Sequence, residues 1–474
     1  MPSAVETHNG ASSVVNPANT ASSSEPVARP RLYGVAWRWH FLAAAIVIPF
    51  VLWQSTTGTL YLWSEWWMDT RHPELRFVAG VSAPVLPSAQ IAAALASLGT
   101  GAPGLSNQHV HRGATFSSPP AAHVGRGPAV QEVLLSDNPR RSTVVLVAAA
   151  NGLPFPVFVD PGDARVLGSL TAAEWLPGLT RALHGGWPLG APGSWLLELG
   201  DGWAIVMILT GWYLWWPRGR GIAAALWPRW GRGPRIVVRD LHAGIAVLFS
   251  AILLFFLVSA LPWTAFWGGE LLSRVQTALG QDSPAGFSPG GAAAADILAA
   301  SAAIDDVAAA ARAGGVTGTL SIRLSPSQGA PLYVANRASS LANDRTLLAD
   351  AGSGRIAADV RHDDLPLIPR LVAVGVHVHQ GDFGPVNLWL NTALALSLLW
   401  LSATGLASWW IRRPKGRAGV PPKRVVPWSR PLFSVIVIMC LAMPIFGLSV
   451  VAIAVVDKLI GVRAGTVLSK TSRG

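Results

Sequence analysis

Four of the eleven histidines occupy matched positions in two similar halves of the chain. His40 and His242 each precede a pair made of a hydroxyl residue and a small residue by seventeen positions. His184 and His379 precede such a pair by twenty-six and twenty-five positions. The pairs are, in the same order, Thr57-Gly58, Ser259-Ala260, Thr210-Gly211 and Thr404-Gly405. Since imidazole nitrogen is a common ligand of transition metals, this spacing points to paired metal sites.

The repeat predicts which histidines meet. Each half has the order span, external domain, span, so we expect parallel repeats related by an axis along the membrane normal. Such an axis brings His40 next to His242 near the cytosolic surface, and His184 next to His379 near the other surface. Paired imidazoles on neighbouring helices suit haem b, which takes two axial nitrogens without covalent attachment. The sequence therefore predicts two haem b sites stacked across a bilayer, with these four histidines as iron ligands.

A single cysteine, Cys440, limits the alternatives. Disulfides within the chain, cysteine-ligated iron–sulfur clusters and c-type haem attachment are all excluded. The sequence also has no glycine-rich phosphate loop of the dinucleotide-binding or P-loop kind, so no nucleotide site is recognisable.

Arginines stand two or three residues before three of the four histidines: Arg38, Arg181 and Arg239. Their guanidinium groups are suited to hold haem propionates by charge-assisted hydrogen bonds. The alternative is that these are ordinary juxtamembrane histidines and arginines. His377 is an alternate to His379, because two such residues of a helix diverge by about 200° and only one can face a given haem.

Two carboxylates, Glu198 and Asp201, lie three residues apart on one face of an expected helix, within an apolar stretch. An ionisable group inside a membrane span is a functional candidate by default. A hydrated position near the surface or a structural pair with arginine is the alternative, and the sequence does not choose between them.

Apolar residues make up 51% of the 474 positions and charged residues 13%, which is typical of a membrane protein. Five stretches satisfy the requirement of about 20 apolar residues for a hydrocarbon core of roughly 30 Å. Many of the 22 tryptophans stand at the ends of these stretches, as in an aromatic belt. We expect a disordered cytosolic tail (1–33), transmembrane helices (34–67, 181–217, 241–269, 371–412 and 431–457), external α+β domains (68–180 and 270–370), cytosolic basic loops (218–240 and 413–430) and an external tail (458–474).

The external domains contain both kinds of regular structure. The segments 87–98 and 292–311 are predicted helices, and the runs "STVVLVAA", "FPVFVD" and "TLSIRLS" are predicted strands.

The distribution of basic residues predicts the orientation. The segment 217–240 holds six arginines and one aspartate, and the segment 412–430 holds seven lysines or arginines and no acid. Short basic loops of this kind remain in the cytosol. We therefore expect a cytosolic N-terminus and a C-terminus on the other side. Nucleic acid is not an expected partner, because the basic residues stand beside spans rather than on a domain.

The spans resemble a known family. The segments "WRWHFLAAAIVIPFVLWQSTTGTLYLW", "TGWYLWWPR", "RDLHAGIAVLF" and "ATGLASWWIRRP" are similar to the bacterial PepSY-associated transmembrane-helix family. The segments "FPVFVDPGDARVLGS" and "LLADAGSGRIAADVR" resemble the closing strand–turn–strand of PepSY domains. The likeness covers roughly residues 34–413. Two departures are Ser259-Ala260 in place of Thr-Gly and the additional His377.

The resemblance implies a helical membrane bundle with two PepSY-like periplasmic domains, in the inner membrane of a bacterium. Members of the family include iron-regulated inner-membrane proteins and di-haem ferric-siderophore reductases. The resemblance thus implies an oxidoreductase with two haem b groups that reduces a ferric siderophore in the periplasm, with quinol or a cytosolic reductase as electron donor. The alternatives are a haem-free PepSY regulator of peptidases or the envelope, and a transporter of iron or siderophore.

Overall fold

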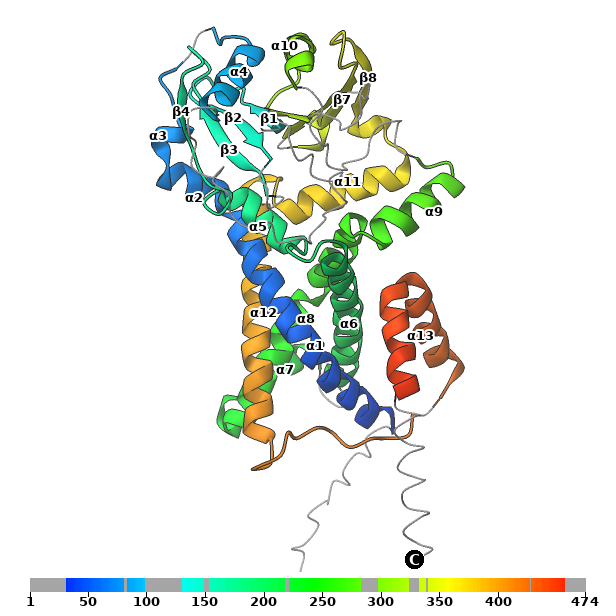
Figure 1. Ribbon diagram of the computed structural model, residues 1–474. Helices are drawn as coiled ribbons and strands as arrows, with labels where there is room; N and C mark the ends of the chain where they lie inside the picture. Colours follow the sequence, from blue (N-terminus) through cyan, green and yellow to red (C-terminus); the bar gives the residue numbers. More distant parts are fainter. Residues whose placement is uncertain are drawn as a thin grey trace, which may run out of the picture.

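The computed structural model describes residues 31–80, 83–98, 130–148, 153–217, 221–282, 297–323, 332–337, 340–426 and 428–456. The predicted tails, 1–33 and 458–474, therefore lie almost wholly outside the described residues. The described chain forms a bundle of long helices with a β-sheet domain at one end (Figure 1).

Within the described residues, three helices are long and apolar enough to cross a membrane: α1 (Arg31–Leu62), α8 (Pro234–Ala260) and α12 (Gly384–Arg412). At 1.5 Å per residue they are roughly 40–48 Å long, which exceeds a hydrocarbon core of about 30 Å. Three of the five predicted spans correspond to these helices. A fourth long helix, α6 (Ala191–Trp215), lies in the same bundle and carries the two carboxylates in its first half.

The bundle is held by close packing between these helices. α1 packs along α6 and α12, and α8 packs along α12 and α6. Gly200 permits the approach of α6 to α1, because a Cβ there would lie 2.5 Å from the ring of Phe50. Nearby, Trp39 stacks on Trp203 with ring centres 6.0 Å apart, and Val47 is fully buried. The helix α1, which carries His40, is therefore fixed relative to α6 by a well-packed core.

The last apolar stretch, predicted as one transmembrane helix over 431–457, differs in the structure. It forms two shorter helices, α13 (Arg430–Ala442) and Pro444–Val456. The chain turns back between them (Figure 1), and a Cβ on Gly447 would lie 2.7 Å from the carbonyl oxygen of Cys440. Each helix is only about 20 Å long, so neither spans the bilayer. The prediction of one continuous helix is wrong. The C-terminal tail was placed in the periplasm because that helix was expected to cross the membrane, so this reason no longer holds.

The sheet domain contains eight antiparallel strands in the order β4-β3-β2-β1-β5-β6-β7-β8. The strands are β1 (Val130–Leu135), β2 (Thr143–Val147), β3 (Phe155–Val159), β4 (Val166–Ser169), β5 (Thr319–Arg323), β6 (Leu332–Arg337), β7 (Arg345–Ala349) and β8 (Ile356–Arg361). Each half is a helix followed by a four-stranded meander. The helices, α4 (Pro87–Leu98) and α10 (Ile297–Ala313), pack against each other.

The two predicted external domains are joined into one. β1 pairs with β5, with Val133 opposite Ile322 and Leu135 opposite Leu320, so the sheet is continuous across the two halves. One hydrophobic core packs against the sheet and includes fully buried residues from both halves. The expectation of two separate domains is therefore corrected to one composite domain. The unpaired edge that each half would expose alone is covered by the other half.

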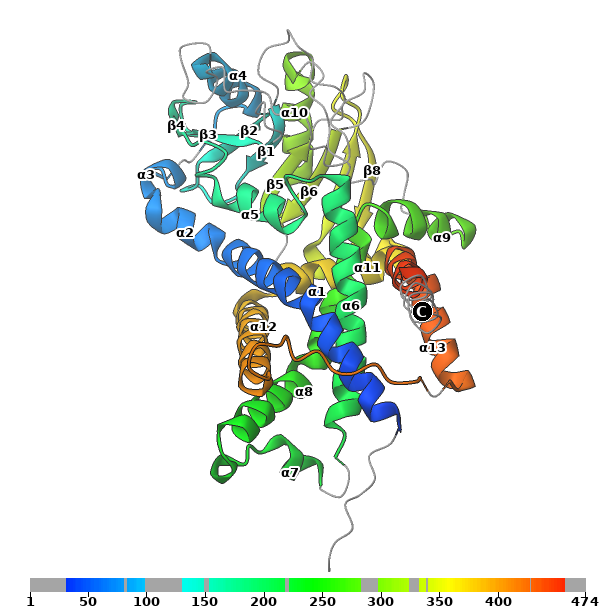
Figure 2. The same cartoon turned by 60° about the horizontal axis from the view of Figure 1, so that its bottom comes forward.

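Short helices connect the sheet domain to the bundle. They include α2 (Ser64–Arg71), α3 (Pro73–Arg76), α5 (Leu176–His184), α9 (Ser273–Ala278) and α11 (Leu367–Gln380). α11 passes between the sheet and the bundle and contacts α8 and α12 (Figure 2). The loop that follows α12 lies at the opposite end of the molecule from the sheet, as does the short helix α7 (Ile222–Leu226) (Figure 1).

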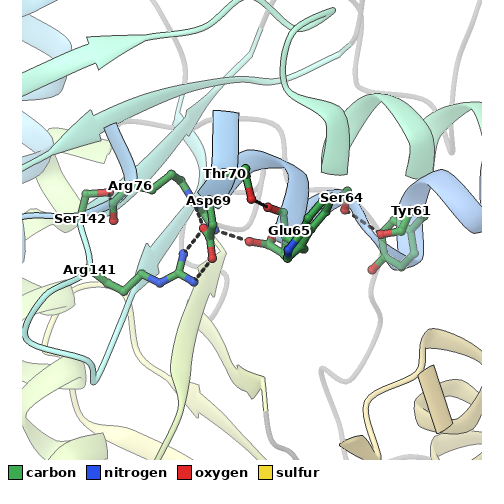
Figure 3. A network of polar contacts seen from close by, with 9 residues as sticks. Tyr61, Ser64, Glu65, Asp69, Thr70, Arg76, Arg141 and Ser142 are labelled. Atoms are coloured by element: carbon green, nitrogen blue, oxygen red, sulfur yellow. Dashed lines mark hydrogen bonds and ion pairs between the residues drawn. The ribbon is translucent and has the colours of Figure 1, made fainter. Parts of the chain in front are cut away.

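A polar network secures the junction below the first half of the sheet (Figure 3). Arg76, whose side chain is 7% exposed, donates to Asp69 at 2.9 Å and to Glu65. Arg141 donates to both oxygens of Asp69, at 2.7 and 2.5 Å. The guanidinium of Arg76 also lies 5.8 Å from the ring centre of Trp175, the residue just before α5. The network therefore couples the end of the first span to the helix that ends at His184.

Candidate histidine-pair sites

The first pair of contacts is reciprocal between α1 and the chain of α5 and α6. His40 lies on α1, and its Nδ1 is 3.1 Å from Thr210 Oγ1 on α6 and 3.1 Å from the carbonyl oxygen of Met207. His184, the last residue of α5, has its Nδ1 3.0 Å from Thr57 Oγ1 on α1. The contacts are therefore exchanged. His40 contacts Thr210, which follows His184 in the sequence pattern, and His184 contacts Thr57, which follows His40.

The second half repeats these contacts. His242 on α8 has its Nδ1 3.0 Å from Thr404 Oγ1 on α12. His379 on α11 has its Nδ1 3.3 Å from Ser259 Oγ on α8. All four predicted ligand histidines therefore have the same kind of anchor. The hydroxyl–small-residue pairs were visible in the sequence, but the sequence did not indicate that they bind the histidines.

The hydroxyl groups fix which imidazole nitrogen carries the proton. A threonine or serine hydroxyl has one proton, and each of these donates it to a carbonyl of its own helix. The distances are 2.8 Å for Thr57, 2.7 Å for Thr210, 2.8 Å for Thr404 and 3.1 Å for Ser259. The hydroxyl oxygen must then accept from Nδ1–H. Each Nε2 is left without a proton and with its lone pair free, the state in which histidine binds a metal.

The small residue after each hydroxyl residue lets the imidazole ring lie close to the helix backbone. A Cβ on Gly58 would lie 3.2 Å from Cε1 of His184, and a Cβ on Gly211 would lie 3.3 Å from Cε1 of His40. The same distance is 3.6 Å for Gly405 and His242. A larger side chain at these positions would push the ring away from the hydroxyl. At Ala260 the chain has a methyl group, and the corresponding Nδ1 to hydroxyl distance is the longest of the four.

The rings approach one another in the predicted pairs. The ring centres of His184 and His379 are 6.2 Å apart. A metal held on opposite sides by two imidazole nitrogens at about 2.0 Å each requires ring centres roughly 6 Å apart. His40 and His242 are close enough to interact electrostatically. Along α1, seventeen residues separate His40 from Thr57, which contacts His184, so the two pairs lie roughly 25 Å apart along the bundle.

The donor set fits haem b better than a non-haem ion. In the described part of the chain, no cluster of three or more histidine, cysteine, aspartate or glutamate side chains could hold a metal ion. Two imidazoles with free Nε2 atoms are instead what a porphyrin iron needs, because the macrocycle fills the other four positions. Aromatic side chains border the pair of His184 and His379, with the ring centres of Phe256 and Trp263 at 4.6 and 5.5 Å from that of His379.

His377 is placed differently from His379. Its Nδ1 is 3.0 Å from Asp382 and its Nε2 is 3.3 Å from Asp344, so both ring nitrogens face carboxylates. Burial lowers the pKa of His377, but the hydrogen bonds to Asp344 and Asp382 outweigh it and raise that pKa to about 9. A protonated imidazole has no lone pair for a metal. The geometry thus favours His379 as the partner of His184.

The three arginines proposed to bind propionates have other surroundings. Arg38 donates to the carbonyl oxygen of Pro421. Arg239 donates to Asp240 at 2.8 Å, and its side chain is 60% exposed. Arg181 is exposed on α5. The carbonyl and the carboxylate already occupy Arg38 and Arg239, so a role in holding propionates stays a prediction.

The carboxylates on α6 are both buried. Glu198 accepts from the backbone N–H groups of Phe266 and Trp267 at 2.9 and 3.1 Å, in the turn that follows α8. Ser194 accepts from the N–H of Ala265 at 2.7 Å. Glu198 therefore has a structural role, because it accepts hydrogen bonds from backbone N–H groups in a non-helical turn. Asp201 is 4% exposed and interacts electrostatically with Glu198.

The model of the PepSY-associated TM region matches residues 37–412 of this chain. This chain belongs to that family. The match includes all four histidines, their hydroxyl anchors and the sheet domain, and ends at the last residue of α12. A comparison with curated proteins gave no match. The family assignment and the apolar helices establish a membrane protein of the PepSY-associated kind.

Proposed function

We propose that this chain is a membrane electron-transfer protein that holds two haem b groups and reduces a ferric siderophore in the bacterial periplasm. The observation that carries the proposal is the set of four histidines whose Nδ1 atoms are bound by hydroxyl groups. Their free Nε2 atoms stand in two pairs at different depths of one bundle. His184 with His379, and His40 with His242, would each hold one haem b, which would supply one-electron transfer between its ferric and ferrous states.

The fold of the chain sets the depth at which each histidine pair lies. The two pairs lie roughly 25 Å apart along α1, which matches most of the hydrocarbon thickness of about 30 Å. His184 ends α5, which lies next to the sheet domain, whereas His40 lies in the half of α1 that is farther from the sheet (Figure 1). We call His184 and His379 the outer pair, and His40 and His242 the inner pair. Ferric iron prefers hard oxygen donors such as those of siderophores, and reduction to softer ferrous iron weakens that binding. Quinol or a cytosolic reductase would supply the electrons.

A reduced-minus-oxidised spectrum of the purified protein tests the proposal. We expect about two haem b per chain. His184→Ala or His379→Ala should remove one haem, and His40→Ala or His242→Ala should remove the other. His377→Ala is the matched control, because it removes a histidine from the same helix as His379 and should leave both haems. A wild-type protein without haem would reject the proposal in favour of a regulator.

Directional assays in proteoliposomes test the order of the two sites. With His184→Ala, a reductant on the side of the basic loops should still reduce the remaining haem, while reduction of ferric siderophore on the sheet side should stop. With His40→Ala, dithionite on the sheet side should still reduce the remaining haem. Its spectrum also shows that the variant is folded. Parental turnover in both variants would contradict a serial path, and uptake of labelled siderophore into the lumen would indicate a transporter.

A further inference from the structure

An open pocket of about 740 Å³ is lined by residues of the C-terminal end of α12 and of the loop after it. This end of α12 is the one farthest from the sheet (Figure 1). Two tryptophans, Trp409 and Trp410, line it together with three basic residues, Arg413, Lys415 and Arg417. The pocket is separate from the histidine pairs. It stands where the candidate span α12 ends, at Arg412, and so at the level where a helix leaves the hydrocarbon core.

The pocket is built by a loop that folds back on the helix end. Trp409 Nε1 donates to the carbonyl oxygen of Ala418 at 2.8 Å. Gly416 and Gly419 adopt left-handed conformations, with φ of 72° and 67°, that other residues rarely adopt. A Cβ on Gly419 would also lie 3.2 Å from Cα of Arg413. The loop therefore has a specific path that keeps its basic residues next to the two indole rings.

The cations of the pocket are arranged for an anion. The guanidinium of Arg413 lies 3.7 Å from the ring centre of Trp410, so its face is stacked. Stacking leaves the N–H groups in the guanidinium plane free to bind the oxygens of a phosphate. Arg412 differs, since it donates to the carbonyl oxygen of Ser408 at 2.8 Å and covers Trp37.

The described residues around the pocket supply no counter-charge. No aspartate or glutamate occurs in the sequence between Asp382 and Asp457. Within the described residues, no carboxylate pairs with Arg413, Lys415 or Arg417. Three unpaired cations beside one pocket favour an external anion, and the tryptophans place that anion at the headgroup level of the membrane.

We propose that this pocket binds the headgroup of an anionic phospholipid. Trp410 is 62% exposed, and Leu406 and Ile411 on the same helix are 45% and 44% exposed. These apolar side chains would lie along the acyl chains, while the phosphate lies against Arg413 and Lys415. A soluble phosphate would gain the ionic contacts but not the apolar ones. The proposal rests on the membrane family and not on the haem sites.

Titration of detergent-solubilised protein with fluorescent phosphatidylglycerol, against phosphatidylcholine, tests the proposal. Each juxtamembrane Lys or Arg contributes about a fivefold change in affinity, so Arg413→Gln with Lys415→Gln should weaken phosphatidylglycerol binding roughly 25-fold. The control, Arg232→Gln with Arg430→Gln, removes two exposed charges that do not line the pocket. We expect less than a twofold change for it.

Three results would overturn the proposal. An equal loss in the control pair would show a diffuse surface-charge effect. Equal affinity for phosphatidylcholine would show that the anion is not recognised. Displacement of the lipid by millimolar inorganic phosphate would assign the pocket to a soluble anion. Thermal melting of the double variant at the wild-type temperature shows that a loss of binding is not a loss of folding, and Arg413→Gln alone provides the second, milder variant.

Discussion

Replacing Thr57 with valine tests the reasoning about the hydroxyl anchors. Valine keeps the shape of threonine but cannot accept the proton of His184 Nδ1, which now lies 3.0 Å from Thr57 Oγ1. Thr57 is the hydrogen-bond acceptor that the structure gives to this Nδ1, so the imidazole loses its orientation and its fixed tautomer. Loss of such an outer-shell partner typically costs 10- to 100-fold in metal affinity, which corresponds to about 1.4 to 2.8 kcal/mol.

The inner pair provides a graded comparison. His40 Nδ1 contacts Thr210 Oγ1 and also the carbonyl oxygen of Met207, both at 3.1 Å. In Thr210→Val the carbonyl remains as an acceptor, so we expect a loss of less than tenfold in haem affinity. Thr57→Val should therefore weaken the outer site more than Thr210→Val weakens the inner site. Thr57→Ser keeps the hydroxyl and should bind haem like the wild type.

Haem titration of the protein purified without haem, followed by absorbance, measures both affinities. Circular dichroism controls for folding, because Thr57→Val leaves the helix and its packing unchanged in volume. If Thr57→Val binds two haems with wild-type affinity, or if Thr210→Val is the more damaging change, the hydroxyl groups do not set the tautomer of the histidines. The argument for ligation through Nε2 would then fail.

Two further predictions concern stability. Arg76→Met should lower the free energy of unfolding by roughly 2 kcal/mol, because it removes the charged hydrogen bonds from buried Arg76 to the partly exposed Asp69 and Glu65; Arg76→Lys should recover only part of it, and an unchanged melting temperature would contradict the role drawn from Figure 3. Glu198→Leu should cost about 1–2 kcal/mol, since it leaves two partly buried N–H groups after α8 without their acceptor; Glu198→Gln keeps an acceptor and should be the milder change in a thermal melt.

The sequence determined the features that depend on composition and periodicity. Long apolar stretches predicted α1, α8 and α12, because a helix in hydrocarbon must satisfy its own backbone and expose apolar side chains. Alternating and continuous apolar runs predicted β2, β3 and β5, and the segment 87–98 is the helix α4. The matched spacing of four histidines also predicted which of them would lie close together.

Tertiary structure decided what depends on contacts between distant segments. The pairing of β1 with β5 joins two predicted domains into one sheet, and no local pattern marks a strand as the partner of another half. The turn between α13 and the helix Pro444–Val456 divides an apolar stretch that is long enough for one span. Hydropathy does not show where the chain reverses direction, so the sequence did not predict this turn.

The candidate site shows the same division. Sequence spacing predicted the four ligand histidines, His40, His184, His242 and His379. It assigned no role to the threonine or serine hydroxyl that contacts each of them. The tautomer of each ring depends on an acceptor from another helix, up to 170 residues away in the chain. Sequence also left His377 as an alternate to its neighbour, and only the fold surrounds it with carboxylates from two loops. The residue types that can bind a metal are local information, whereas the nitrogen that remains free to bind is decided by packing.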